Sequence, residues 1–314
     1  MKKIIIIMCV LFPIIAFSQE KVSQSTLSIA DKYLNISTFR EAFKQNIGSM
    51  TGNRVGVVVN DSFNITHGAA MASIVEGVKI SNDVRVIGRD INKPAADCKA
   101  TDNKGRRVKC ELSNDVENLL AKGDVRVWNE SNGWPVSPKL RDSISYATIT
   151  DQFKRLLKKY DVMYMVAAGN NNESFGARNV KTLLNNPFDN LFAVAQFGID
   201  TETGKPVMQN GKFFRAPDFS VFGEYVVEDG KKAMTYSGTS NATAVASAII
   251  AQYYSIMPCW STMDMKRFIY ATLQPAQNIG LKDLWTKTKK YLTYSEKIFD
   301  QKFLRANNIK VCKD

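Results

Sequence analysis

Short apolar runs alternate with longer segments of mixed polarity along most of the chain. Runs rich in β-branched, aromatic and other apolar residues predict strands at 55–59, 84–87, 124–128, 162–168 and 191–195. Segments with helical patterning predict helices at 67–78, 112–122, 143–160 and 240–256. Because helices separate most of these strands, the order predicts βαβ units and a parallel sheet. We therefore expect an α/β fold, a three-layer sandwich with a mostly parallel central sheet flanked by helices.

Candidate chemistry lies where strands end and helices begin, which is where functional groups gather in such folds. Asp61 follows the strand at 55–59, and Asn170 follows the strand at 162–168. His67 opens a helix and is the only histidine, so acid–base chemistry by an imidazole must use it. Ser240 lies in a first helical turn, where backbone N–H groups and the helix dipole favour a developing oxyanion. Taken singly, each residue also fits an ordinary turn or helix cap.

Together the four segments resemble the subtilisin-like serine peptidases. In that family the motifs Asp-Ser/Thr-Gly, His-Gly-Thr, Ala-Gly-Asn and Gly-Thr-Ser-x-Ala-x-Pro follow one another in this order. Here they read Asp61-Ser62-Phe63, His67-Gly68-Ala69, Ala168-Gly169-Asn170 and Gly238-Thr239-Ser240, continuing to Ala244. The stretch from Ser131 to Gly133 is similar to the end of the family's substrate-binding strand. The resemblance covers residues 55–273.

The resemblance implies a serine endopeptidase acting on proteins or peptides through an acyl-enzyme. Asp61 would orient His67, and His67 would take the proton from Ser240 as this serine attacks the scissile carbonyl. The Asn170 amide and the Ser240 backbone N–H would bind the oxyanion. The expected substrate-binding residues have small side chains that leave room for a bulky apolar group before the cut: Ser131, Gly133, Ala168 and Gly169.

The resemblance assigns no cofactor to the reaction. Structural calcium is frequent in the family, but no ligand spacing in this sequence assigns a calcium site, and we predict no metal-binding residue.

Three departures from the family pattern concern supporting positions: Phe63 stands for Gly, Ala69 for Thr and Ala244 for Pro. A fourth is the spacing of Asp61 and His67, which only five residues separate. Six extended steps reach roughly 20 Å, so a direct turn can join the two. Asp90, after the next strand, is the alternative acid. The alternative function is a catalytically silent homologue that binds peptides.

The first residues predict export. Met1-Lys2-Lys3 precedes an apolar stretch that ends in Ala16-Phe17-Ser18, as in a secretory signal peptide. The stretch is too short to span a bilayer, so we expect no stable membrane anchor and a secreted or periplasmic protein starting near Gln19.

The cysteines fit an oxidising compartment. Cys9 lies in the signal peptide, and the other four allow three pairings, of which Cys98–Cys110 with Cys259–Cys312 is the simplest. A thiolate zinc site is a weaker alternative, because it would require Cys-x-x-Cys spacing, which this sequence lacks.

The length fits one large domain with short appendages. We expect a signal peptide at 1–18, a short N-terminal segment at 19–53, a peptidase domain at 54–275 and a basic, disulfide-tethered extension at 276–314. About 35 residues lie between Gln19 and the first strand, too few for a long inhibitory pro-region.

The net charge of +12 allows nucleic acid or other anionic partners. No aromatic residue interrupts the basic loop at 99–109 to stack bases, so we interpret this loop and the stretch at 282–290 as solvated faces. We expect no nucleic-acid partner and a monomeric protein.

Overall fold

The computed structural model of the chain describes residues 21–46, 53–63, 66–90, 114–131, 153–170, 189–208, 217–228, 232–281, 286 and 289–312. Within these residues the central sheet has the order β11-β12-β8-β6-β5-β4-β2-β3, and β7 pairs with β6. Its strands are β2 Val55–Asp61, β3 Val84–Asp90, β4 Val125–Glu130, β5 Met163–Ala167, β6 Leu191–Ile199, β7 Pro206–Met208, β8 Phe219–Phe222, β11 Gln274–Pro275 and β12 Lys290–Tyr291. All neighbours on this path run parallel except β11 and β12, and β7 runs antiparallel to β6.

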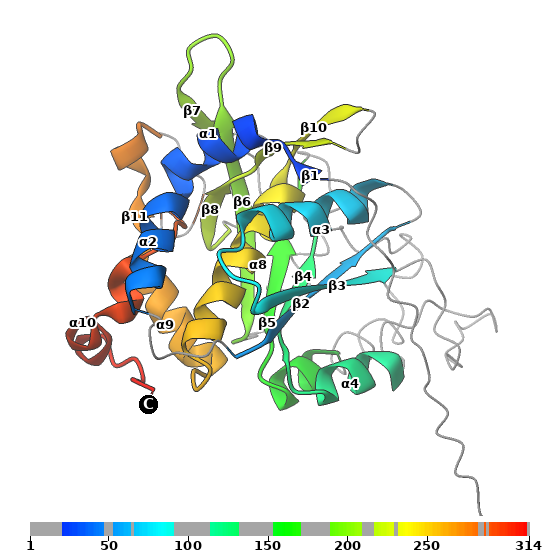
Figure 1. Cartoon of the computed structure of the whole chain (residues 1–314), viewed down its shortest axis with the longest axis vertical. Coiled ribbons are helices and arrows are strands. Elements are labelled where there is room, and N and C mark those ends of the chain that lie inside the picture. Colours follow the sequence, from blue (N-terminus) through cyan, green and yellow to red (C-terminus); the bar gives the residue numbers. More distant parts are fainter. Residues whose placement is uncertain are drawn as a thin grey trace, which may run out of the picture.

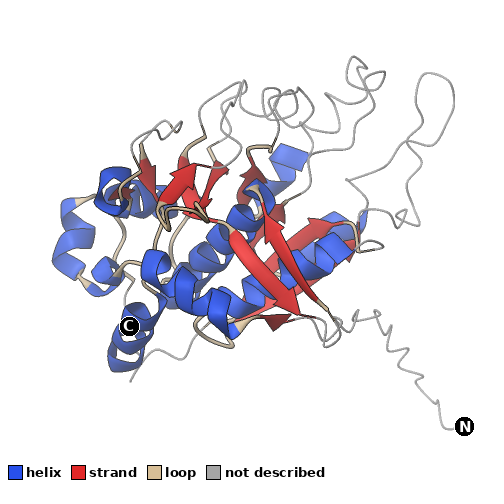
Figure 2. Ribbon diagram, turned by 90° about the horizontal axis from the view of Figure 1, so that it is seen from above, coloured by secondary structure: helices blue, strands red, loops and turns tan. Residues whose placement is uncertain are grey.

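Helices cover both faces of this sheet (Figures 1 and 2). The helices are α1 Gln24–Leu34, α2 Ile36–Asn46, α3 Thr66–Val78, α4 Asn114–Ala121, α8 Thr239–Ile256, α9 Thr262–Thr272 and α10 Gln301–Ala306, and residues 153–159 are also helical. Two 3₁₀ turns, η1 Ala276–Ile279 and η2 Glu296–Phe299, lie near the C-terminus. A smaller antiparallel sheet joins β1 Lys21–Val22, β9 Glu224–Glu228 and β10 Ala233–Ser237.

The alternation of side chains along the strands creates two separate cores. Val57 and Val59 of β2 pack in a large cluster that also contains the apolar residues of α3 and α8. Val58, between them, packs in a smaller cluster on the opposite face with Trp128 and Phe153. The α8 face and the α4 face of the sheet are named here after these helices. The structure confirms the predicted three-layer α/β fold.

The predicted strands and helices are confirmed wherever the structure describes them. β2, β3, β4, β5 and β6 coincide with the five predicted strands, and α3, α4 and α8 with three predicted helices. Of the helix predicted at 143–160, residues 153–159 are helical and 143–152 lie outside the described residues. The segments that form α1, α2, α9 and β8 to β10 were not predicted as helices or strands.

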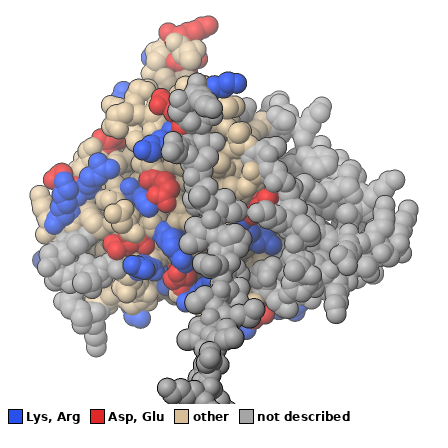
Figure 3. All heavy atoms as spheres, turned by 45° about the vertical axis from the view of Figure 1, so that its right-hand side comes forward, with Lys and Arg blue, Asp and Glu red and all other residues tan. Residues whose placement is uncertain are grey.

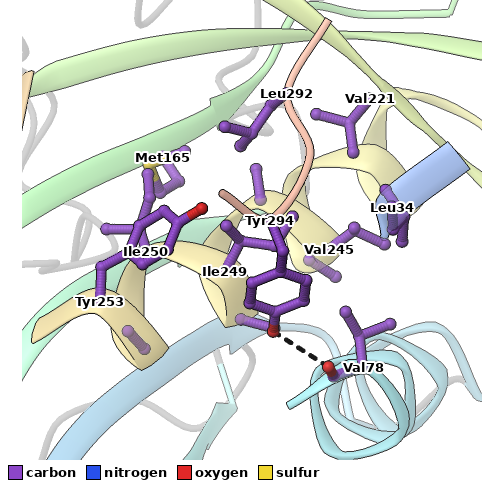
Figure 4. Close-up of a cluster of buried hydrophobic side chains, with 14 of the residues drawn as sticks. Leu34, Val78, Met165, Val221, Val245, Ile249, Ile250, Tyr253, Leu292 and Tyr294 are labelled. Carbon is purple, nitrogen blue, oxygen red and sulfur yellow. Dashed lines mark hydrogen bonds between the residues drawn. The ribbon is translucent and has the colours of Figure 1, made fainter. Parts of the chain in front are cut away.

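Both terminal segments pack into the large cluster of the α8 face. Leu34 and Phe39 from the N-terminal helices are fully buried there, as are Leu292 and Tyr294 from the C-terminal segment. Figure 4 shows Tyr294 between α3 and α8, with its hydroxyl donating to Val78 O at 3.0 Å. The two termini therefore share one core with the helices that carry the candidate site.

A disulfide joins Cys259, just beyond α8, to Cys312, with Cα atoms 5.7 Å apart. This is one of the two predicted pairs; the other, Cys98–Cys110, lies outside the described residues. Among the described helices none is both long and apolar enough to cross a bilayer.

Candidate active site

The Asp61 carboxylate and the His67 ring form a direct pair. Asp61 ends β2 with its side chain fully buried, whereas His67, the second residue of α3, is 27% exposed. His67 Nδ1 lies 2.9 Å from each carboxylate oxygen of Asp61. Because an ionised carboxylate only accepts hydrogen bonds, Nδ1 carries the proton, and Nε2 of the neutral ring keeps its lone pair. The arrangement orients His67 to act as a base through Nε2.

The short spacing between these residues is accommodated by a close turn. Gly68 N donates to Ser62 O at 3.1 Å, directly connecting the start of α3 to the end of β2. A Cβ atom on Gly68 would lie 2.9 Å from Ser62 O, so only glycine permits this approach. The Phe63 ring lies about 3 Å from the same point, so it covers Gly68. A bulky residue at 63 is thus part of how this chain closes the turn.

The alternative acid, Asp90, supports the turn, and among the described residues no hydrogen bond joins it to His67. It lies beside Asp61 in the register of β2 and β3, and its Oδ1 accepts from Phe63 N at 3.4 Å. The hydrogen bonds of the His67 ring go to Asp61.

Ser240, the second residue of α8, is joined to the end of β4 by reciprocal hydrogen bonds. Its hydroxyl donates to Ser131 O at 2.7 Å, and the Ser131 hydroxyl donates to Ser240 O at 3.0 Å. Ser240 is 8% exposed. In the described part of the chain no hydrogen bond joins the Ser240 hydroxyl to His67. The structure therefore holds this hydroxyl on a strand-end carbonyl.

The Asn170 side chain is oriented by Thr239. Its Oδ1 accepts from Thr239 N at 2.8 Å and from the Thr239 hydroxyl at 3.0 Å, and this hydroxyl accepts from Gly169 N at 3.1 Å. A backbone N–H can only meet the amide oxygen, so Nδ2 is left as an available donor. A Cβ atom on Gly238 would lie 3.0 Å from that nitrogen, so glycine is needed for this close approach.

Two donors thus lie at the start of α8 without a partner among the described residues: Asn170 Nδ2 and the Ser240 backbone N–H. The first N–H groups of a helix have no intrahelical partner, and they carry the positive end of its dipole. Sequence reasoning missed the role of Thr239, although its place immediately before Ser240 was the available signal.

Three of the four predicted substrate-binding residues are described. Ser131 follows β4, and Ala168 and Gly169 follow the neighbouring strand β5, so they lie at one edge of the sheet. Ser131 and Ala168 are buried at 2% and 4% exposure, and Gly169 has a φ of 103°, a conformation that favours glycine. Gly133, the fourth, lies outside the described residues.

Charged side chains of both signs are interspersed over the described residues in Figure 3. The basic loop at 99–109 lies outside the described residues, as does most of the stretch at 282–290. Among the residues that the structure describes, no group of three or more histidine, cysteine, aspartate or glutamate side chains is arranged to hold a metal ion.

The sequence model of the subtilase family matches residues 23–297. No curated protein sequence matches the chain.

Solved structures with a similar fold include a toxin subunit, a protease and a keratinolytic enzyme. The A-subunit of the AB5 toxin from E. coli has a TM-score of 0.57 at 16% identity, with 86% of this chain and 98% of that chain covered. The MycP3 protease from the type VII (ESX-3) secretion system has a TM-score of 0.54 at 16% identity, with 87% of each chain covered. Fervidolysin from Fervidobacterium pennivorans, a keratinolytic enzyme related to subtilisin, has a TM-score of 0.55 at 15% identity, with 82% of this chain and 44% of that chain covered. At these identities the similarity is one of fold.

Proposed function

The chain belongs to the subtilase family, and on this basis we propose that it is a serine endopeptidase that cleaves protein or peptide substrates through an acyl-enzyme. The observation that carries the proposal is the contact between Asp61 and His67 Nδ1. This contact leaves Nε2 of the only histidine in the chain as the ring nitrogen that can accept a proton.

The first step is the release of the Ser240 hydroxyl from Ser131 O. A substrate backbone N–H that bonds to this carbonyl takes the place of the serine, whose hydroxyl then turns towards His67 Nε2. His67 takes the proton while Ser240 Oγ bonds to the scissile carbonyl carbon. Asp61 stabilises the imidazolium that results.

The oxygen of the attacked carbonyl becomes an oxyanion, and the two free donors, Asn170 Nδ2 and Ser240 N–H, are suited to bind it. His67 then gives its proton to the leaving amine as the peptide bond breaks. Water hydrolyses the acyl-enzyme by the same proton transfers in reverse, which restores Ser240.

A fluorophosphonate probe tests the proposal, because it labels only an activated serine. The mature wild type should be labelled, while Ser240→Ala and His67→Ala should not. Ser28→Ala, which alters an exposed serine of α1, is the matched control and should be labelled like the wild type. A folded wild type that stays unlabelled, under conditions that label an active peptidase, would refute the proposal.

One observation favours a second function, that of a silent peptide-binding homologue: the Ser240 hydroxyl is held by Ser131 O and not by His67. In that protein a peptide binds along the ends of β4 and β5 and is recovered intact. Incubation with a peptide mixture separates the two functions, because the endopeptidase produces new amino termini, whereas the silent homologue gives saturable binding without cleavage.

We further propose that the protein is exported and cut before Gln19. The first described element, β1, begins at Lys21 and pairs with β9, so this cut leaves the fold intact. The disulfide between Cys259 and Cys312 suits an oxidising compartment. Mass spectrometry of the exported protein should find Gln19 at its amino terminus, and an uncut Met1 would contradict the proposal.

A further inference from the structure

A buried chain of hydrogen bonds connects β4 to the first turns of α8. Asn129 and Ser131 lie two residues apart, on the same side of β4, and both face α8. Asn129 is fully buried and Ser131 is 2% exposed. Asn129 Nδ2 donates to the Ser247 hydroxyl at 3.1 Å, and the Ser131 hydroxyl lies 2.8 Å from Asn129 Oδ1 and 3.0 Å from Ser240 O.

The direction of each hydrogen bond in this chain is fixed by proton supply. The Ser247 hydroxyl gives its only proton to Thr243 O, at 2.8 Å, so it can only accept from Asn129. The Asn129 amide is therefore oriented with Nδ2 towards Ser247 and Oδ1 towards Ser131. The single Ser131 proton is shared between Asn129 Oδ1 and Ser240 O. The chain begins and ends on carbonyl groups of α8.

Packing alone does not account for a fully buried asparagine at this place. Burying an amide costs free energy unless every polar atom is hydrogen-bonded, and an apolar side chain would fill the same space without that requirement. Here the Asn129 side chain is hydrogen-bonded through Nδ2 to Ser247 of α8 and through Oδ1 to the Ser131 hydroxyl at the end of β4. The Ser131 hydroxyl in turn contacts the backbone oxygen of Ser240. The same serine donates to Ser131 O, the carbonyl that substrate must reach.

We propose that Asn129 is a positioning residue, anchored on Ser247, which sets the distance between the Ser131 carbonyl and the Ser240 backbone. This inference rests on the proposed peptidase function. Asn129 does not touch the reacting atoms; through the Ser131 hydroxyl it holds the strand end that binds substrate against the helix start that carries the nucleophile and the oxyanion donor.

The test compares two buried amide side chains, Asn129 of β4 and Gln252 of α8. Asn129→Leu fills the space but removes the chain. Gln252→Leu is the matched control, because Gln252 is also fully buried and belongs to α8, but its Oε1 accepts from the backbone of Ile80 and Ser81, far from Ser240. Activity per labelled active site, KM and the free energy of unfolding are measured for both.

Asn129→Leu should lower kcat about 10- to 100-fold, since a displacement of about 1 Å from productive geometry has an effect of this size, and should change KM less than kcat. Gln252→Leu should lose stability without losing kcat per active site. Ser247→Ala should also lower kcat. Ser247→Thr, which keeps a hydroxyl, should have a kcat close to that of the wild type. Equal kcat in Asn129→Leu and the wild type, or an equal loss in Gln252→Leu, would overturn the inference.

Failure of the proposed function would be recognised separately, by a wild type that neither turns over peptide nor reacts with the probe. In that case the rate of amide hydrogen exchange at the start of α8 measures how firmly Asn129 holds this part of the helix. Exchange there should be faster in Asn129→Leu and unchanged in Gln252→Leu, whereas unchanged exchange in Asn129→Leu would overturn the inference.

Discussion

The two faces of the central sheet use buried polar groups in different ways. On the α8 face, Asn129 and Ser131 bond from strand to helix and reach the backbone of Ser240. On the α4 face, polar side chains bond from strand to strand: Asn60 Nδ2 donates to Glu130 Oε2 at 2.7 Å, and Arg89 donates to Asn60 Oδ1 at 2.6 Å. One face places the helix that carries the proposed nucleophile, Ser240, and the other ties β3, β2 and β4 together.

We expect this difference to separate activity from stability. The residues that bond from strand to strand on the α4 face are direct neighbours of candidate site residues. At the end of β2, Asn60 precedes Asp61, and at the end of β4, Glu130 precedes Ser131. Because successive side chains point to opposite faces, the candidate chemical groups lie on the α8 side while their immediate neighbours hold the strands in register. Substitutions on the α8 side of this edge should therefore impair catalysis, and substitutions on the α4 side should mainly impair folding.

The largest expected effect is that of Asp61→Asn. The asparagine can still accept from Ser62 N, which lies 2.6 Å from Asp61 Oδ1, so the turn should survive. It replaces one of the two oxygens that lie 2.9 Å from His67 Nδ1 by an NH₂ donor, which disfavours the tautomer with the proton on Nδ1, and as a neutral amide it cannot stabilise the imidazolium. We expect kcat to fall about 10⁴-fold with little change in the free energy of unfolding, as measured by peptide hydrolysis and denaturant titration.

Asp90→Asn is the control for that substitution. The two carboxylates are neighbours in register, but Asp90 accepts from Phe63 N and does not bond to the ring of His67. Its kcat should stay within about tenfold of the wild type, because the hydrogen bond to Phe63 N supports the turn and does not orient the His67 ring. Equal losses in the two variants would mean that the acid of the site is wrongly assigned.

On the α4 face, Trp128→Ala should have the largest effect on stability. Trp128 is 1% exposed, and its ring packs edge-on against Phe153 with centroids 5.2 Å apart. Removing a buried aromatic side chain typically costs about 3–5 kcal/mol of stability, because of lost burial and the cavity left behind. We expect this loss in urea unfolding, with kcat per labelled active site within about threefold of the wild type.

Trp128→Phe keeps an aromatic ring and should lose clearly less stability than Trp128→Ala. A large loss of kcat in the folded alanine variant, similar to that of Asn129→Leu, would remove the distinction between the two faces.

The groups of the candidate site could be proposed from the sequence because each is encoded locally. Asp61, His67, Asn170 and Ser240 stand at pattern boundaries between strands, turns and helices. The partner of Asn129 could not be predicted, because Ser247 is 118 residues away and only the packing of α8 on β4 brings the two together. The available signal was that Asn129 is polar although it lies on the same side of β4 as Val127, which packs in the large cluster.

The terminal helices could not be predicted to join the core for a related reason. α1 and α2 bury apolar residues such as Leu34 and Phe39, but the surface that receives them is formed by α8 and the C-terminal segment, more than 200 residues later. Phe39 stacks on Tyr294 with centroids 4.7 Å apart. Docking of such a segment depends on this distant surface and not on its own pattern.

The disulfide should stabilise the α8 face without affecting catalysis. Cys259 lies beyond the C-terminal end of α8, whose 18 residues span about 27 Å, and Ser240 lies at the opposite end of this helix. Replacing both Cys259 and Cys312 by serine opens a loop with a sequence separation of 53, which should cost about 2–4 kcal/mol of stability. The measurement is urea unfolding alongside kcat; a loss of kcat in the folded double variant would show that the far end of α8 is coupled to the site.

The smallest expected effect is that of Tyr225→Phe, which removes a buried hydroxyl on the α8 face. Tyr225 is fully buried, and its hydroxyl has no hydrogen-bond partner among the described residues. Tyr225→Phe removes this unsatisfied group, so we expect the free energy of unfolding at pH 7 to rise by up to about 1 kcal/mol. Tyr253→Phe is the control, because the Tyr253 hydroxyl accepts from Ser295 N at 2.7 Å; it should lose about 1–3 kcal/mol.

Alkaline pH sharpens this last comparison, because burial raises the pKa of both Tyr225 and Tyr253 well above the usual value of 10. Above about pH 10 the unfolded chain loses protons that the folded protein retains, so the stability present below that pH decreases as the pH rises. Each phenol contributes about 1.4 kcal/mol per pH unit to this slope. Both phenylalanine variants should therefore lose stability less steeply above pH 10, despite their opposite effects at pH 7; a slope unchanged from the wild type would mean that these phenols ionise in the folded protein.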